Sequence, residues 1–231
     1  MTASAQTLFF SLLGGIVPAI VWLLFWLKED SKRPEPRGML MLSFFAGMLA
    51  VPLVIPFQKY FQITGDETTT FLIWAALEET LKFIVAFFVA IHQKEDNEPV
   101  DGLIYMLTVA LGFSAMENAL FIFNPLSMGN ITESLITGNV RFIGASLLHT
   151  LCSAVIGIGL GLSYYKATAT KVWSVAVSLI LAIALHTAFN LFIMKGQSGT
   201  TFATFGFVWI AIVVLMLFFE KVKSIYPVNK I

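Results

Sequence analysis

Apolar residues along this chain gather into seven long stretches that are separated by short polar connections. The stretches cover approximately residues 7–27, 38–57, 70–92, 102–123, 141–165, 172–194 and 201–220. Each stretch has about the 20 residues that a helix needs to cross the hydrocarbon core of a bilayer. The pattern predicts an all-α, polytopic bundle of seven transmembrane helices, with a connecting loop at residues 124–140.

The composition supports this interpretation. Of the 231 residues, 58% are hydrophobic and only 12% are charged, whereas about 25% of the residues of soluble domains are charged. The formal net charge is zero, so nothing indicates binding to nucleic acid. No change of composition divides the sequence. We therefore expect a single membrane-embedded domain over residues 1–231, with a motif-bearing core at about residues 70–194.

Lysine and arginine are divided unequally between the two predicted sides of the membrane. One side collects ten of them, namely Lys28, Lys32, Arg33, Arg37, Lys94, Lys166, Lys171, Lys221, Lys223 and Lys230. The other side has only Lys59, Arg141 and Lys195. Because short cytoplasmic loops carry the excess of basic residues, we expect a cell-membrane protein with its N-terminus outside and its C-terminus in the cytoplasm.

Five ionisable residues interrupt the apolar stretches, and they are Glu78, Glu79, Glu117, His149 and His186. A charged side chain at mid-bilayer costs at least about 2.5–3.5 kcal/mol, so such residues generally face a polar interior and have a function there. Counted at 1.5 Å per residue from the expected helix ends, all five lie about 9–14 Å below the predicted outer surface. The pattern therefore predicts that four helices bring their rare polar groups into one layer.

Polar neighbours on the same helices favour a common site. Three pairs of residues four apart share a helix face, and they are Glu78 with Lys82, His149 with Ser153, and His186 with Asn190. Glu79 is rotated about 100° from Glu78, so we expect one carboxylate to face the site and the other to face a neighbouring helix. Arg141 is expected to extend to the membrane interface.

Each of these elements also has a purely structural interpretation. Glu78 and Lys82 can form a buried ion pair that joins helices, and Glu117 beside Asn118 can bond to a neighbouring helix. Two other functions are open. A proton- or ion-coupled transporter uses similar carboxylate and histidine relays, but it predicts polar residues at several depths rather than in one layer. The second alternative is a non-catalytic membrane scaffold that holds partner proteins.

Peptide hydrolysis is the chemistry that this residue set fits best. Histidine and carboxylate ligands hold a divalent metal, typically zinc, with one position left to water, and a nearby carboxylate can act as the general base. We assign Glu117, His149 and His186 as candidate metal ligands, and either Glu78 or Glu79 as the base. Two adjacent acids can also activate water without a metal. The chain contains neither His-Glu-x-x-His nor Gly-x-Ser-x-Gly.

Four motifs follow one another in the core of the chain. They are Glu78-Glu79-Thr80-Leu81-Lys82, Phe113-Ser114-Ala115-Met116-Glu117-Asn118, His149-Thr150-Leu151-Cys152-Ser153 and His186-Thr187-Ala188-Phe189-Asn190. In these motifs the sequence resembles the PrsW family of intramembrane proteases, within the wider superfamily of CAAX-processing (Abi) proteases. The second motif ends in Glu117 where the prenyl-protein branch uses histidine, which argues against CAAX processing.

The resemblance implies a fold, an activity and a set of site residues. The implied catalytic residues are Glu78, Glu79, Glu117, His149 and His186. The candidate supporting residues are Lys82, Asn118, Ser153 and Asn190. The family is usually described as metal-dependent, although a metal-free glutamate mechanism is proposed for its relatives. Its substrates are membrane-anchored proteins, among them anti-sigma factors, whose first cut releases a transcriptional response. We expect cleavage of single-pass membrane proteins near the outer face of the membrane.

Overall fold

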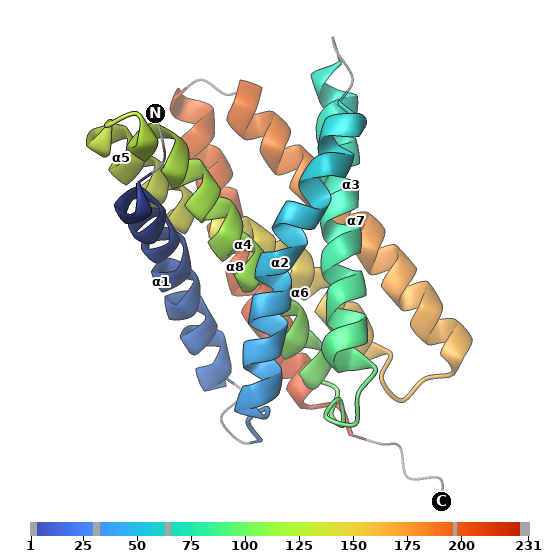
Figure 1. Cartoon of the computed structure of the whole chain (residues 1–231). Helices are drawn as coiled ribbons and strands as arrows, with labels where there is room; N and C mark the ends of the chain where they lie inside the picture. The colour runs from blue at the N-terminus through green and yellow to red at the C-terminus, as the bar shows by residue number, and fades with distance from the viewer. Residues whose placement is uncertain (1–3, 30–32, 63–65, 196–197, 227–231) are drawn as a thin grey trace, which may run out of the picture.

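The computed structural model describes residues 4–29, 33–62, 66–195 and 198–226, and these residues form a bundle of helices (Figure 1). The helices are α1 (Ala5–Glu29), α2 (Arg37–Tyr60), α3 (Glu67–Ala86), α4 (Asp101–Ser127), α5 (Ile131–Ile143), α6 (Ala145–Leu162), α7 (Thr168–Lys195) and α8 (Ser198–Lys223). A π-helical turn, η1 (Phe87–Ile91), continues α3. The described residues contain no strand. The prediction of an all-α membrane bundle is confirmed.

Six segments are long and apolar enough to cross a membrane, by length and composition. They are α1, α2, α4, α5 together with α6, α7, and α8 from Phe205 to Lys223. Helix α3 is long enough but carries Glu67 in its first turn and three further charged residues, Glu78, Glu79 and Lys82. It nevertheless runs through the bundle in contact with α2 and α7 (Figure 1). Each of the seven predicted stretches therefore corresponds to a helix of the structure.

The predicted loop at residues 124–140 was wrong, because most of this segment is helical. Helix α4 continues to Ser127, and α5 begins at Ile131 after Gly129, whose φ of 80° lies in the left-handed region. The side chain of Asn130 caps α5 by accepting a hydrogen bond of 3.1 Å from the backbone N–H of Glu133. An asparagine followed three residues later by glutamate is close to the capping-box signature of a helix start.

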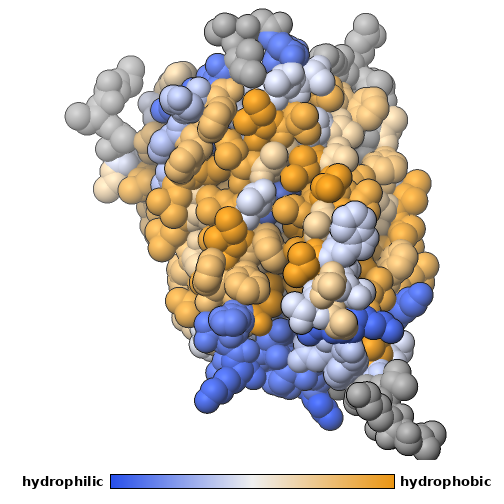
Figure 2. Space-filling model, turned by 90° about the vertical axis from the view of Figure 1, so that its right-hand side faces the viewer, coloured by the Kyte–Doolittle hydropathy of each residue, from blue (hydrophilic) through white to orange (hydrophobic). Residues whose placement is uncertain are grey.

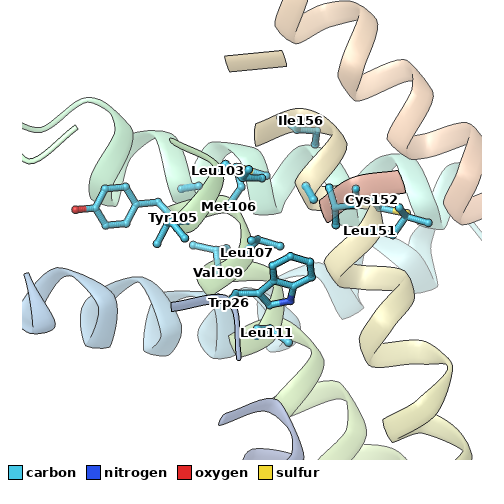
Figure 3. Close-up of a cluster of buried hydrophobic side chains, with 14 of the residues drawn as sticks. Trp26, Leu103, Tyr105, Met106, Leu107, Val109, Leu111, Leu151, Cys152 and Ile156 are labelled. Atoms are coloured by element: carbon cyan, nitrogen blue, oxygen red, sulfur yellow. The ribbon is translucent and has the colours of Figure 1, made fainter. Parts of the chain in front are cut away.

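Helix α4 forms the centre of the bundle. Its residues 101–115 are all buried, and it contacts α1, α2 and α6. Figure 3 shows its side chains between Trp26 of α1 and Leu151, Cys152 and Ile156 of α6. A helix that is apolar on all sides belongs in the interior, which agrees with this position.

Hydrophilic residues gather at the lower end of the bundle, below an apolar band (Figure 2). Of the ten basic residues predicted on one side, Lys32 and Lys230 lie outside the described residues. The other eight predicted members of this group belong to the helix ends and connections at the lower end of Figure 1. Arg33 forms an ion pair with Glu98 there, and Nζ of Lys223 donates to the carbonyl oxygen of Glu29 at 2.9 Å. Which end faces the cytoplasm stays a prediction.

Glycines bring α2 and α4 into direct backbone contact. A Cβ atom at Gly112 of α4 would lie 2.0 Å from the carbonyl oxygen of Phe44. A Cβ atom at Gly47 of α2 would lie 2.1 Å from the carbonyl oxygen of Val109. Both distances are far below van der Waals contact with backbone atoms that cannot rotate away, so only glycine allows this approach.

We expect Gly112→Ala to destabilise the protein by about 1–3 kcal/mol, the usual cost of overpacking a well-packed interior. Thermal unfolding of the purified protein in detergent measures this effect. Gly38→Ala is the matched control, because a Cβ atom at Gly38 meets nothing within 4 Å. Equal unfolding temperatures for the two variants would contradict the backbone contact between α2 and α4.

Candidate active site

Four helices bring the five predicted ionisable residues together. Glu78 and Glu79 come from α3, Glu117 from α4, His149 from α6 and His186 from α7. The two imidazole rings meet edge to face, with their centroids 5.3 Å apart. Glu78 is eleven residues after Glu67 and Glu117 is ten residues before Ser127, which corresponds to about 15–17 Å from those helix ends. The depth of the group in the membrane stays a prediction.

Lys82 lies at the centre of this group and is completely buried. Its Nζ atom is 2.7 Å from Oε1 of Glu79 and 2.7 Å from Nδ1 of His149. The predicted partner, Glu78, is more distant, with its Oε2 atom 3.9 Å from the ammonium. The ammonium also lies 4.5 Å from the centroid of the Phe113 ring. A buried charge is tolerated only when it is paired, and Glu79 provides the principal pairing.

The hydrogen bonds assign a tautomer to each histidine. A lysine ammonium can only donate, so Nδ1 of His149 accepts from Lys82. The Nε2–H group of His149 then donates to Oε2 of Glu117 at 2.9 Å. His186 shows the opposite arrangement, because its Nδ1–H group donates to Oε1 of Glu79 at 2.7 Å. The Nε2 atom of His186 therefore keeps a free lone pair, 3.8 Å from Oε2 of Glu78.

The two adjacent carboxylates occupy different environments. Glu78 lines a cavity, and its Oε1 atom accepts a hydrogen bond of 2.9 Å from Nε2 of Gln58. Its Oε2 atom has no hydrogen-bond partner among the described residues. Glu79 is fully buried behind Glu78. The sequence analysis missed Gln58, which lies one residue beyond the second predicted stretch.

Arg141 turns inward, so the prediction that it extends to the interface was wrong. Its guanidinium forms an ion pair with Glu117 and donates from Nε to Oδ1 of Asn118 at 2.6 Å. Asn118 in turn donates to the hydroxyl of Ser146 at 3.0 Å. Glu117 could have predicted this pairing from the sequence, because a carboxylate inside a membrane needs a cationic partner. Arg141, in the last turn of α5, is that partner.

The cavity beside these residues has a volume of about 680 Å³. Every helix from α2 to α8 contributes to its wall. Its lining combines the polar groups Glu78, Glu117, Arg141, His149 and His186 with apolar side chains. A mostly apolar cavity with a few convergent polar groups is typical of a binding or active site.

Comparison with known proteins identifies the chain. The family described as "PrsW family intramembrane metalloprotease" matches residues 35–218. This chain belongs to the PrsW family. The relative named Protease PrsW from Oceanobacillus iheyensis is 30% identical over 192 residues, which cover 81% of this chain and 84% of the relative. The Protease PrsW of Bacillus subtilis (strain 168) is 28% identical over 189 residues, covering 80% and 83% respectively. No solved structure matches the chain.

The prediction of a multi-pass intramembrane protease is therefore confirmed. A third relative, the Protease PrsW of Halalkalibacterium halodurans, is 26% identical over 216 residues, which cover 88% of this chain and 94% of the relative. The similarity thus extends over most of both chains.

The PrsW family is described as metalloproteases, and the residues of this site fit a divalent metal. Glu78, His149 and His186 are buried, and each offers one ligand atom within 4.8 Å of the others. Nε2 of His186 has its lone pair free, whereas His149 would have to give up its bond to Lys82 or to Glu117 before one of its nitrogens could bind a metal. Two imidazoles and one carboxylate form a known ligand set of catalytic zinc. The unpartnered Oε2 atom of Glu78 agrees with this use. A second group with the same spacing combines Glu79, Cys152 and His186.

The remaining predicted residues differ in their positions within this PrsW-family site. Asn190 lines the same cavity as His186. Ser153 is buried, and its hydroxyl has no hydrogen-bond partner among the described residues. Ser153 therefore does not orient His149, although the two share a helix face.

Proposed function

We propose that Glu78 is the general base of this protease and that Glu79 is a positioning residue. One observation carries the proposal. Each of the two adjacent carboxylates has one oxygen without a hydrogen-bond partner among the described residues. Of the two, Glu78 lines the cavity, whereas Glu79 does not and instead binds Lys82 and His186.

The proposed roles follow from the contacts of each side chain. Glu78 accepts a proton from a water molecule that attacks the substrate carbonyl, and it returns this proton to the leaving amine. Glu79 accepts the Nδ1–H hydrogen bond of His186, which keeps the Nε2 lone pair of this ring directed toward Glu78. A carboxylate that orients a histidine in this way is a common supporting element of metal sites. Arg141 holds the carboxylate of Glu117 beside His149.

His149 and His186, together with either Glu117 or Glu78, are the residues that would hold a divalent metal, and this donor set favours zinc. When bound, the ion polarises the substrate carbonyl and lowers the pKa of water. Glu78 is free to act as the base when Glu117 completes the ligand set. Activation of water by the glutamates without a metal is the alternative.

The proposed substrate is a single-pass membrane protein, such as an anti-sigma factor, cut near the outer face of the membrane. The depth of the site supports this choice. Glu117 is ten residues from the end of α4 that lies opposite the basic residues, and sixteen residues from Asp101 at the basic end. His186 is nine residues from Lys195 and eighteen from Thr168. The site is therefore nearer to the end with few basic residues.

Mass spectrometry of membrane-protein N-termini tests the function. Cells with the wild-type protein are compared with cells that carry Glu78→Gln or Glu79→Ala at matched abundance. In wild-type cells we expect new N-termini near the outer end of single-pass segments. In Glu78→Gln cells, which lack the general base, the abundance of these N-termini should fall at least about 100-fold. Glu220→Gln is the control, because Glu220 is an exposed residue at the basic end of α8. Identical sets of N-termini in all strains would contradict the proposal and favour a transporter or a scaffold.

Elemental analysis of the purified protein tests the metal assignment independently of activity. We expect about one zinc ion per chain, lost in His149→Ala and in His186→Ala because catalytic zinc needs three protein ligands. If the zinc ion is lost from Glu117→Gln but kept by Glu78→Gln, Glu78 stays the base. If it is kept by Glu117→Gln but lost from Glu78→Gln, Glu78 is a ligand. Cys152→Ser should keep the metal. A metal-free wild-type protein that cleaves at the full rate would contradict metal dependence.

A further inference from the structure

The close approach of α2 and α4 at Gly47 and Gly112 acts as the lower boundary of an opening between the two helices. At this point the two backbones touch, Gly47 against Val109 and Gly112 against Phe44. Above it α2 leaves α4 and runs beside α3 (Figure 1). Two hydrogen bonds hold the upper half of α2 against α3. Nε1 of Trp74 donates to the backbone carbonyl of Gln58 at 3.1 Å, and the side chain of Gln58 donates to Glu78.

Two prolines within α2 explain why this helix packs on α4 in its lower half and on α3 in its upper half. Pro52 and Pro56 lie inside the helix, between the contact at Gly47 and the bonds at Gln58. Each proline removes one helical hydrogen bond and clashes with the preceding turn, which bends a helix. The bend allows the lower half of α2 to pack on α4 and the upper half to pack on α3.

Above the glycines, Val51 and Val54 of α2 still form a buried cluster with Phe113 of α4. From this cluster upward the two helix faces line the active-site cavity. On α2 the lining residues are Val51, Val54, Ile55 and Gln58. On α4 they are Phe113, Glu117, Leu120, Phe121 and Asn124. Each set follows the spacing of a single helix face, so two whole faces line the cavity.

The exposure of these residues increases with distance from the glycine contact. On α4, Phe113 is 1% exposed, whereas Leu120 is 44% and Phe121 is 50% exposed. On α2, Val51 and Val54 are buried, while Ile55 and Gln58 are partly exposed. The cavity wall therefore reaches the surface of the bundle at the upper halves of α2 and α4, where its exposed residues Leu120 and Phe121 are apolar.

We infer that this opening, which we name the α2–α4 entrance, admits an unwound segment of a single-pass membrane substrate to the active site. The inference rests on the proposed peptidase function. The lining supports a peptide as the occupant. Apolar residues at the rim match substrate side chains, and the amide groups of Gln58 and Asn124 match peptide N–H and C=O groups. A helical peptide bond is already hydrogen-bonded within its own backbone, so the segment must unwind to reach Glu78.

Photocrosslinking from defined positions tests the entrance. Benzoylphenylalanine is placed at Ile55 or Leu120, in protein that carries Glu78→Gln and is reconstituted in proteoliposomes. The probe is a biotinylated synthetic peptide with about 20 apolar residues, enough to span the bilayer, and a central Gly-Pro pair that favours unwinding. The control positions are Leu49 and Leu53 of α2, which are 62% and 60% exposed and do not line the cavity.

We expect several-fold more labelling of the peptide from Ile55 and Leu120 than from Leu49 and Leu53. Equal labelling from all four positions, or none from the two entrance positions, would overturn the inference. Capture of a diazirine-labelled phospholipid in preference to the peptide at the entrance would also overturn it, by assigning the opening to lipid.

A second variant separates the entrance from the catalytic chemistry. Ile55→Trp should fill the opening and reduce cleavage of single-pass proteins several-fold, whereas Leu53→Trp should leave cleavage unchanged. Crosslinking needs no hydrolysis, because the crosslinked protein carries Glu78→Gln. Peptide bound at the entrance of a wild-type protein that never cleaves would therefore reject the proposed function and keep the entrance. Cleavage at the wild-type rate in folded Ile55→Trp would reject the entrance and keep the function.

Discussion

The buried ammonium of Lys82 is the charge on which the rest of the site depends. Its partners come from two helices, Glu79 on its own α3 and His149 on α6. Because the ammonium can only donate, it determines which nitrogen of His149 carries the proton, and through that proton it connects α6 to Glu117 on α4. Glu79 extends the same network to His186 on α7. One cation thus organises four helices around the cavity.

The fold was largely predictable from the sequence, because crossing a bilayer requires long apolar helices and leaves few other solutions. The seven apolar stretches identified the helices, including α3 despite the charges of Glu78, Glu79 and Lys82. Helix α5 was not predicted, since a short amphipathic segment has too few apolar residues to resemble a membrane span. The bend of α2 was also missed. Pro52 and Pro56 are visible in the sequence, but the change of partner that they produce depends on packing against α3 and α4.

The site was predictable at the level of which residues meet, and less so at the level of which atoms pair. Equal depth on antiparallel helices brought Glu78, Glu117 and His186 together as expected. Periodicity gives the face of each helix but not its rotation toward its neighbours. The structure therefore pairs Lys82 principally with Glu79, three residues away, instead of Glu78. For the same reason Arg141 could not be assigned to Glu117, because that pair depends on the unpredicted α5.

A thermal unfolding cycle on Lys82 and Glu79 tests this central claim most directly. Lys82→Met leaves Glu79 as an uncompensated buried charge, which should cost about 3–5 kcal/mol. Adding Glu79→Gln removes that charge, so we expect the double variant to unfold at a higher temperature than Lys82→Met alone in the same detergent. Wild-type stability of Lys82→Met, or a double variant whose loss equals the sum of the two single losses, would contradict the claim that this pair organises the site.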